Sequence, residues 1–183
     1  MKDLGAVAMS LLYLLLVREV SAETYRNTAH HYSITFGDDW KRREAPEGPS
    51  DLILLCINST CGKSTSLEIG ARFVPQLRDR PAEDFLKNID VDKLTQLIQQ
   101  MPEVEELKIL HEGQATVGVA QAYEVVIEFR YREGAAIRQR IMHTFVTFDR
   151  GNVYKISFYS YSADYERDFA LAQDVLATFA IQQ

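Results

Sequence analysis

Four arginines flank one short turn and are the residues best suited to recognise a charged group: Arg130, Arg132, Arg138 and Arg140. The segment between the two pairs is Glu133-Gly134-Ala135. If these three residues form the turn, equal parity places Arg130 and Arg132 on one face of the first strand. Arg138 and Arg140 can then lie across from them on the second strand, on the same face. Guanidinium groups this close repel one another unless acids intervene or an anion binds, and Glu128 and Glu133 are available as partners. The cluster therefore predicts either a solvated strand face with local ion pairs or a site for an anionic partner protein or polyanion.

The two cysteines of the chain, Cys56 and Cys61, bracket four residues. A hairpin turn between them could bring their Cα atoms within the roughly 4.4–6.8 Å that a disulfide tolerates. A redox pair is disfavoured because the spacing is not C-x-x-C and no helix start follows. Two cysteines are too few for a disulfide scaffold, and they lack the four-ligand pattern of a zinc site. We therefore predict a disulfide that stiffens the loop and stabilises the fold by about 2 kcal/mol.

Four histidines could supply metal ligands only if the fold brought them together. His30 and His31 are adjacent and would point opposite ways on a strand, whereas His111 and His143 lie on separate predicted strands. Isolated histidines of this kind are more often packed or solvated than bound to a metal. The prediction is that the chain has no metal site and no cofactor.

Recognisable catalytic motifs are missing from the sequence. It has no Gly-x-Ser-x-Gly, no His-Glu-x-x-His, no dinucleotide fingerprint and no distinctive pair of carboxylates. Gly62-Lys63-Ser64 resembles the end of a phosphate-binding loop, but Ile57 occupies the position where that loop needs a glycine. No catalytic residue is therefore predicted.

The composition limits the range of partners. The 183 residues are 46% hydrophobic and 25% charged, as in an ordinary globular chain, and the formal net charge is −6. Binding to nucleic acid phosphates relies on dense lysine and arginine, so a nucleic acid partner is disfavoured. We expect a protein or envelope component instead.

The first residues have the plan of a secretory signal peptide. Lys2 precedes an apolar run from Leu4 to Val17, and small residues at Val20 and Ala22 suit a cleavage site. The run is shorter than the roughly 20 residues of a membrane span, although an uncleaved anchor is the alternative. We predict a signal peptide over residues 1–22 and one exported domain over residues 23–183, in the periplasm or secreted. Export would place the cysteines in an oxidising compartment.

The stretch from Gln121 to Tyr161 predicts a meander of three antiparallel strands. Apolar and polar residues alternate through Tyr123–Tyr131 and Val153–Tyr161, as in half-buried strands. The segment Ile137–Phe148 becomes apolar on both parities, which predicts a central strand covered on both sides. Asp149-Arg150-Gly151-Asn152 forms the second turn, where Gly151 can take a positive φ.

The other elements follow from shorter patterns. Strands are predicted at 32–36, 52–57, 67–73 and 107–111, with a turn at Glu112-Gly113 and a bulge or close backbone approach at Gly118. Trp40 is predicted to pack in the core or at its rim rather than to serve as a ligand platform. A kinked helix or two short helices run from Pro81 to before Pro102. A closing amphipathic helix spans 163–179 with Ser162 as its N-cap.

The strand Tyr32–Phe36 followed by Trp40, a hairpin, a helix from Pro81, a meander and a closing helix that ends in Phe179 resembles the PsbP-like superfamily. That group includes Ran-binding Mog proteins, photosystem PsbP subunits and small exported bacterial proteins. The resemblance implies an α+β fold in which an antiparallel sheet with the C-terminal meander is sandwiched between helices. It also implies a non-enzymatic role in binding or assembly, without assigning any residue to a site.

The sequence therefore favours a non-enzymatic exported module that engages a partner protein or an acidic envelope component. The alternative is a small exported hydrolase or lytic enzyme whose site is assembled from residues remote in the sequence. An enzyme should show a deep cleft with titratable groups within hydrogen-bond reach, whereas a binding module should show an exposed groove or patch.

Overall fold

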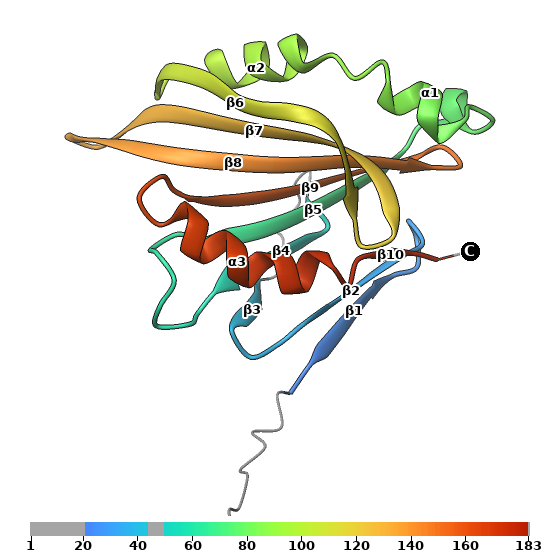
Figure 1. The fold of residues 1–183 in the computed structure, drawn as a ribbon, viewed down its shortest axis with the longest axis horizontal. Coiled ribbons are helices and arrows are strands. Elements are labelled where there is room, and N and C mark those ends of the chain that lie inside the picture. The colour runs from blue at the N-terminus through green and yellow to red at the C-terminus, as the bar shows by residue number, and fades with distance from the viewer. Residues whose placement is uncertain (1–20, 44–49, 183) are drawn as a thin grey trace, which may run out of the picture.

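Antiparallel β-sheet makes up most of the part of the chain that the structure describes, residues 21–43 and 50–182 of a computed structural model (Figure 1). The strands are β1 (Glu23–Asn27), β2 (Tyr32–Phe36), β3 (Trp40–Arg43), β4 (Leu52–Cys56), β5 (Ser66–Phe73), β6 (Val104–Val117), β7 (Ala120–Glu133), β8 (Ala136–Asp149), β9 (Asn152–Tyr161) and β10 (Ala180–Ile181). The helices are the short 3-10 turn η1 (Pro75–Leu77), α1 (Ala82–Leu86), α2 (Val91–Gln99) and α3 (Tyr165–Leu176). Nearly all of the predicted signal peptide lies outside the described residues.

Two sheets share these strands. The larger has the order β3-β4-β5-β9-β8-β7-β6, and the smaller has the order β1-β2-β10. Every adjacent pair is antiparallel. The predicted meander of β7, β8 and β9 is confirmed, and β6 extends it by one more strand.

Each face of the large sheet is covered by different elements, because side chains alternate along every strand. One face, here called the α3 face, packs against α3 and the small sheet and contains the main core, with Tyr32, Tyr154, Phe158 and Phe179 fully enclosed. The other, here called the α2 face, packs under α1 and α2 through a smaller cluster that includes Ile127 and Met142 (Figure 1). The α+β prediction of an antiparallel sheet between helices is confirmed.

Strand β8 is central, as its two-sided apolar pattern predicts. It pairs with β7 on one side and β9 on the other, and residues 141–145 are all buried. Met142 joins the cluster under α2, whereas Phe145 joins the main core on the opposite face. Trp40 is also buried in the main core, as predicted, and begins β3.

The turn predicted at Glu112-Gly113 is wrong. Strand β6 continues through Gly113 to Val117, because it pairs with β7 along its whole length and absorbs its irregularities as register shifts. The chain reverses instead after Val117, where Gly118 has φ +55° and approaches the Phe179 carbonyl so closely that no side chain would fit. The predicted close approach at Gly118 is thus confirmed.

Of the two forms predicted between Pro81 and Pro102, a kinked helix or two short helices, the structure has the two short helices α1 and α2. Helix α2 begins after Asp90, which is its N-cap: the Asp90 carboxylate accepts a hydrogen bond from the Lys93 amide at 3.1 Å. Helix α3 is shorter than predicted, and its N-cap residue is Asp164 rather than Ser162. Among the described residues, none of the helices combines the length and apolar character that crossing a bilayer requires.

Candidate functional site

The register of the β7–β8 hairpin decides where the four predicted arginines lie. Glu133 pairs with Ala136, so the turn contains two residues rather than three. Side chains that lie opposite each other then differ in parity, and Arg138 lies opposite Tyr131. A shift of one residue moves every side chain of a strand to the other face. The predicted convergence of the four arginines is therefore wrong, and each face of the sheet carries two of them.

Arg130 and Arg132 lie on the α3 face, and each has a glutamate of β6 beside it. Arg130 Nη1 donates to Glu106 Oε2 at 3.0 Å, and Arg132 pairs with Glu105. The arginine side chains are 44% and 58% exposed. These glutamates are available because β6 begins at Val104, earlier than the sequence pattern predicts. This pair of arginines therefore forms a solvated face with local ion pairs.

Arg138 and Arg140 lie on the α2 face, over tyrosines of β9. The Arg140 guanidinium carbon is 5.6 Å from the centre of the Tyr159 ring and 5.9 Å from that of Tyr161, and Arg138 is also 5.9 Å from Tyr161. Contacts of this kind attract a cation to the ring face. Together with Tyr131, these residues are called the tyrosine–arginine face below.

The two arginines of this face differ in their partners. Arg138 Nε pairs with Glu133 at 3.2 Å, as the sequence allowed. Arg140 forms no ion pair with the described residues; its Nη2 donates to the Ser64 carbonyl at 2.8 Å, and its buried Nε finds no partner there. Burial raises the pKa of Tyr159 to about 12, so its hydroxyl stays neutral beside the cation. Arg140 therefore retains a charge that the fold does not neutralise.

A hollow of about 390 Å³ extends from Tyr159 across β5 and β9. Glu68, Arg72, Met101 and Lys155 contribute to its lining. Desolvation lowers the pKa of Lys155, although Glu68 acts in the opposite direction. The hollow thus adjoins the tyrosine–arginine face and carries further basic groups with one acid.

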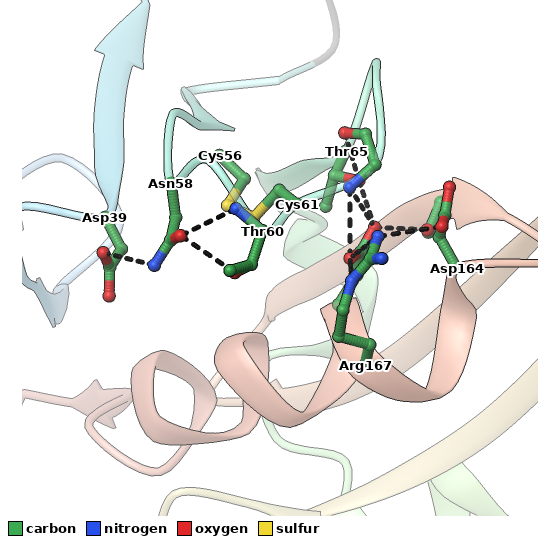
Figure 2. The surroundings of a disulfide bond; sticks show 11 residues. Asp39, Cys56, Asn58, Thr60, Cys61, Thr65, Asp164 and Arg167 are labelled. Carbon is green, nitrogen blue, oxygen red and sulfur yellow. Dashed lines mark hydrogen bonds and ion pairs between the residues drawn. A yellow bond between two sulfur atoms is a disulfide. The ribbon is translucent and has the colours of Figure 1, made fainter.

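The predicted disulfide joins Cys56 and Cys61, whose Cα atoms are 6.3 Å apart (Figure 2). Inside the loop, Asn58 Oδ1 accepts hydrogen bonds from the amide and the hydroxyl of Thr60 at 2.9 and 2.8 Å. Asn58 Nδ2 donates to Asp39 Oδ1 at 2.8 Å and ties the loop to the start of β3. The loop is therefore held by polar contacts as well as by the disulfide.

Asp168 of α3 fixes the chain just beyond the disulfide. Its carboxylate is fully buried and accepts from the Gly62 amide at 3.0 Å, Thr65 Oγ1 at 2.5 Å, Ser160 Oγ at 2.8 Å and Arg167 Nη2 at 2.9 Å. Burial alone raises the pKa of Asp168, but these donors outweigh burial and hold the pKa below its usual range. This group has a structural role, because its hydrogen bonds are all made within the fold.

Comparison with solved structures identifies the fold. Cyanobacterial PsbP (CyanoP) from Synechocystis sp. PCC 6803 is 15% identical with a TM-score of 0.57, over 97% of this chain and 98% of that one. The Ran-binding protein Mog1p of Saccharomyces cerevisiae is 9% identical with a TM-score of 0.54, over 88% and 96%. LpqN, involved in cell envelope biogenesis of Mycobacterium tuberculosis, is 12% identical with a TM-score of 0.51, over 90% and 92%. The chain has the PsbP-like fold.

Sequence comparison alone does not reach this result, since no protein-family model and no curated protein matches the chain. The resemblance to the PsbP-like superfamily is confirmed at the level of the fold, through the order of elements and the position of the core. At identities of 9–15%, no site residue transfers from these structures to this chain.

The PsbP-like fold also brings together two histidines that lie far apart in the sequence. Glu124 contacts His143 Nε2 through one carboxylate oxygen and lies 3.4 Å from His111 Nε2 through the other. His143 Nδ1 is 2.7 Å from the Tyr165 hydroxyl. Burial lowers the pKa of His143, while Glu124 acts in the opposite direction. Within residues 21–43 and 50–182, no three side chains are arranged to hold a metal ion.

Part of this arrangement can be recognised in the sequence. The pattern places His111 and His143 on strands, but it does not distinguish their shared partner Glu124 from a solvated acid of an alternating strand. Tyr159 and Tyr161 also looked like ordinary strand residues. Only the register of β7, β8 and β9 shows that they lie beneath Arg138 and Arg140.

Proposed function

We propose that this protein is a non-enzymatic exported module for binding or assembly, and that its tyrosine–arginine face engages an acidic partner protein or envelope component. One observation carries the proposal. Arg140 lies over two tyrosine rings with no carboxylate within ion-pair distance among the described residues, and its Nε is buried without a partner. A buried donor that has no acceptor within the fold is suited to a hydrogen bond with an acceptor on a ligand.

The difference between the two arginine pairs supports the choice of this face. On the α3 face, Arg130 and Arg132 each have a glutamate, so their charge is locally balanced. On the α2 face, Arg138 forms an ion pair with Glu133, whereas Arg140 contacts only the Ser64 carbonyl and aromatic rings among the described residues. A local excess of positive charge in a chain of net charge −6 favours an acidic surface over indiscriminate binding.

The structural relatives agree with a binding role without defining this one. Mog1p is described as Ran-binding, and LpqN as involved in cell envelope biogenesis. The fold therefore serves recognition in at least one protein and an envelope process in another. We infer that the present chain uses the same scaffold for a partner of its own.

Export is the second part of the proposal. The disulfide Cys56–Cys61 suits an oxidising compartment such as the periplasm or the extracellular space. The segment 1–22 has the composition of a cleaved signal peptide. Mass spectrometry of the protein recovered from the envelope fraction should find Ala22 absent and Glu23 at the amino terminus.

The hydrolase alternative has less support. The chain of contacts from Tyr165 through His143 to Glu124 resembles a catalytic relay in residue types. However, His143 is 3% exposed and stacks between Phe145 and Phe169, at centroid distances of 4.6 and 4.3 Å. A substrate could not reach its ring, so the contact network fits a structural role better than general base catalysis.

Paired variants on the two faces test the proposal. Arg138→Gln with Arg140→Gln removes the charge of the tyrosine–arginine face, and Arg130→Gln with Arg132→Gln removes the same charge from the α3 face. The tagged chain would be used to capture partners from the native envelope at increasing salt concentrations. We expect the first double variant to lose capture and the second to retain it, with wild-type capture weakening as salt rises.

Circular dichroism and thermal unfolding would establish that both double variants are folded. Equal capture by the two folded variants would refute the tyrosine–arginine face as the binding site. Loss of capture by the α3-face variant alone would assign binding to the opposite face of the sheet.

A further inference from the structure

A second hollow, of about 330 Å³, is lined by residues of the β1–β2 turn, the β8–β9 turn and the C-terminal segment. These three segments lie toward the same end of the molecule (Figure 1). The hollow shares no residue with the tyrosine–arginine face. Its lining includes His31, Phe73, Arg78, Asp149, Arg150 and Asn152. They come from four separate segments of the chain, so only the folded state assembles them.

The walls of this hollow are held by hydrogen bonds between those segments. The Val74 amide donates to the Gly151 carbonyl at 2.7 Å, and the Gln182 amide donates to the His31 carbonyl at 2.7 Å. Gly151 also packs so closely on Phe73 that a Cβ would lie 2.8 Å from its ring. The hollow is therefore preformed, which reduces the ordering that a ligand would have to impose.

Backbone conformation singles out two of the lining residues. Among the described residues, three other than glycine have positive φ, namely His31 at 54°, Ser64 at 68° and Arg150 at 44°. Two of the three line this hollow. Arg150 is the first central residue of a two-residue hairpin turn, where glycine, asparagine or aspartate is favoured and a long side chain is not. The turn does not require arginine at this position, so the guanidinium group is available for another role.

The hollow is basic. Arg150 Nε pairs with Asp149 at 3.2 Å, which leaves its terminal nitrogens as donors, and Arg78 forms no ion pair within the described part of the chain. Asn152 Oδ1 contacts His30 Nδ1 at 3.2 Å, so the Asn152 amide nitrogen remains a donor. Two arginines against one acid give a positive charge, and the 43% exposed Phe73 adds an apolar surface.

We propose that this hollow binds a small organic anion, with a phosphate or carboxylate group held by Arg78 and Arg150 and an apolar body resting on Phe73. Guanidinium groups recognise both kinds of oxyanion through paired N–H donors. The site is independent of the proposed partner surface, so either can fail without the other.

Phenyl phosphate and benzoate are suitable probes, and benzyl alcohol supplies a similar ring without the charge. Binding to the full chain would be measured by calorimetry. The informative variants are Arg150→Gly and Arg78→Gln. Arg150→Gly removes the guanidinium but suits the left-handed turn, so it should not lower the melting temperature. Each variant should weaken binding of the anionic probes by about tenfold or more, equivalent to about 1.4 kcal/mol.

Two control variants match these changes elsewhere. Ser64→Gly places a glycine at another residue with positive φ, outside the hollow. Arg80→Gln removes an arginine that is close to Arg78 in the sequence but does not line the hollow. Both should bind the anionic probes as the wild type does. A preference for phenyl phosphate over benzoate, or the reverse, would identify which oxyanion the site takes.

Three results would overturn the proposal. The first is no binding of either anionic probe by the wild-type chain. The second is unchanged affinity in both Arg150→Gly and Arg78→Gln. The third is equal binding of benzyl alcohol and the anionic probes, which would show an apolar site without anion recognition.

Discussion

The two faces of the seven-stranded sheet differ in how completely the fold covers them. On the α3 face, the helix and the small sheet enclose the main core, and the buried carboxylate of Asp168 has hydrogen-bond donors around it. On the α2 face, α1 and α2 pack on β6, β7 and β8, and a hollow lies over β5 and β9. The tyrosine–arginine face is formed on the same side by residues of β7, β8 and β9. The first face stabilises the fold, whereas the second leaves aromatic and basic groups available for a partner.

This difference explains why two arginine pairs from one hairpin have different partners. The backbone of β7 and β8 presents both pairs at similar distances from the turn. The β6 glutamates neutralise the pair on the α3 face, and the β9 tyrosines support the pair on the α2 face without neutralising Arg140. Neighbouring strands, more than the hairpin itself, therefore determine how these arginines are partnered.

Truncation of matched phenylalanines on the two faces gives the largest expected effect. Phe145 is 6% exposed in the main core, whereas Phe129 is only partly buried beside the cluster under α2. Phe145→Ala should lower the free energy of unfolding by about 3–5 kcal/mol, because a core cavity adds to the lost burial. Phe129→Ala should cost less than half as much. Urea unfolding of both variants would measure the difference.

If Phe129→Ala proved as costly as Phe145→Ala, the α2 face would be as tightly packed as the α3 face. The contrast between a stabilising face and an open one would then be wrong. Similar slopes of unfolding free energy against urea concentration would show that both variants unfold from comparably compact states.

Removal of the disulfide should have the next largest effect. Cys56→Ser with Cys61→Ser opens a loop of six residues that is anchored to α3 through Gly62 and Asp168. The chain-entropy estimate gives a loss of about 2 kcal/mol. Thermal unfolding of the double variant would measure it, with the reduced wild-type chain as the control. A loss far below this value would mean that the polar anchors alone hold the loop against the α3 face.

Much of this fold could be predicted from the sequence because its strands are long and alternate clearly. The meander, the central position of β8, the two short helices and the disulfide all follow from local patterns. Strands β1, β3 and β10 could not be predicted, since they are short and form only by pairing with strands remote in the sequence. The full length of β6 was hidden by Gly113, which an edge strand tolerates.

The candidate site was harder to predict, because it depends on register. Choosing a two-residue turn at Gly134-Ala135 instead of a three-residue turn moves Arg138 and Arg140 to the face opposite Arg130 and Arg132. The sequence permits either turn. The tyrosines that define the site belong to β9, so their position relative to these arginines requires the β8–β9 pairing as well.

The buried histidine of the α3 face, His143, should make the free energy of unfolding depend on pH. Burial lowers the pKa of His143 below its ordinary value of 6.5, so the unfolded chain binds more protons than the folded one as the pH falls through that value. The free energy of unfolding should therefore decrease between about pH 7 and pH 5, by less than about 1.4 kcal/mol per pH unit for one proton.

Several groups face His143 and define the controls: Glu124 of β7, His111 of β6 and Tyr165 of α3. His143→Gln should flatten the pH dependence, whereas His111→Gln should change it less, since the His111 side chain is 59% exposed. Urea unfolding across this pH range would measure both. A wild-type chain that gained stability on acidification would show that Glu124 outweighs burial and that this part of the α3 face stores an ion pair.

The exposed ion pair between Arg130 and Glu106 should have the smallest effect. Both side chains are substantially exposed, at 44% and 63%, so water and salt screen their attraction. A double-mutant cycle of Arg130→Gln and Glu106→Gln should give a coupling energy below about 0.5 kcal/mol at physiological ionic strength. Coupling above about 1 kcal/mol would exceed what exposed pairs usually contribute. Arg130 would then contribute to the stability of the α3 face. The variant Arg130→Gln with Arg132→Gln could in that case no longer serve as a structurally neutral control in the capture experiment.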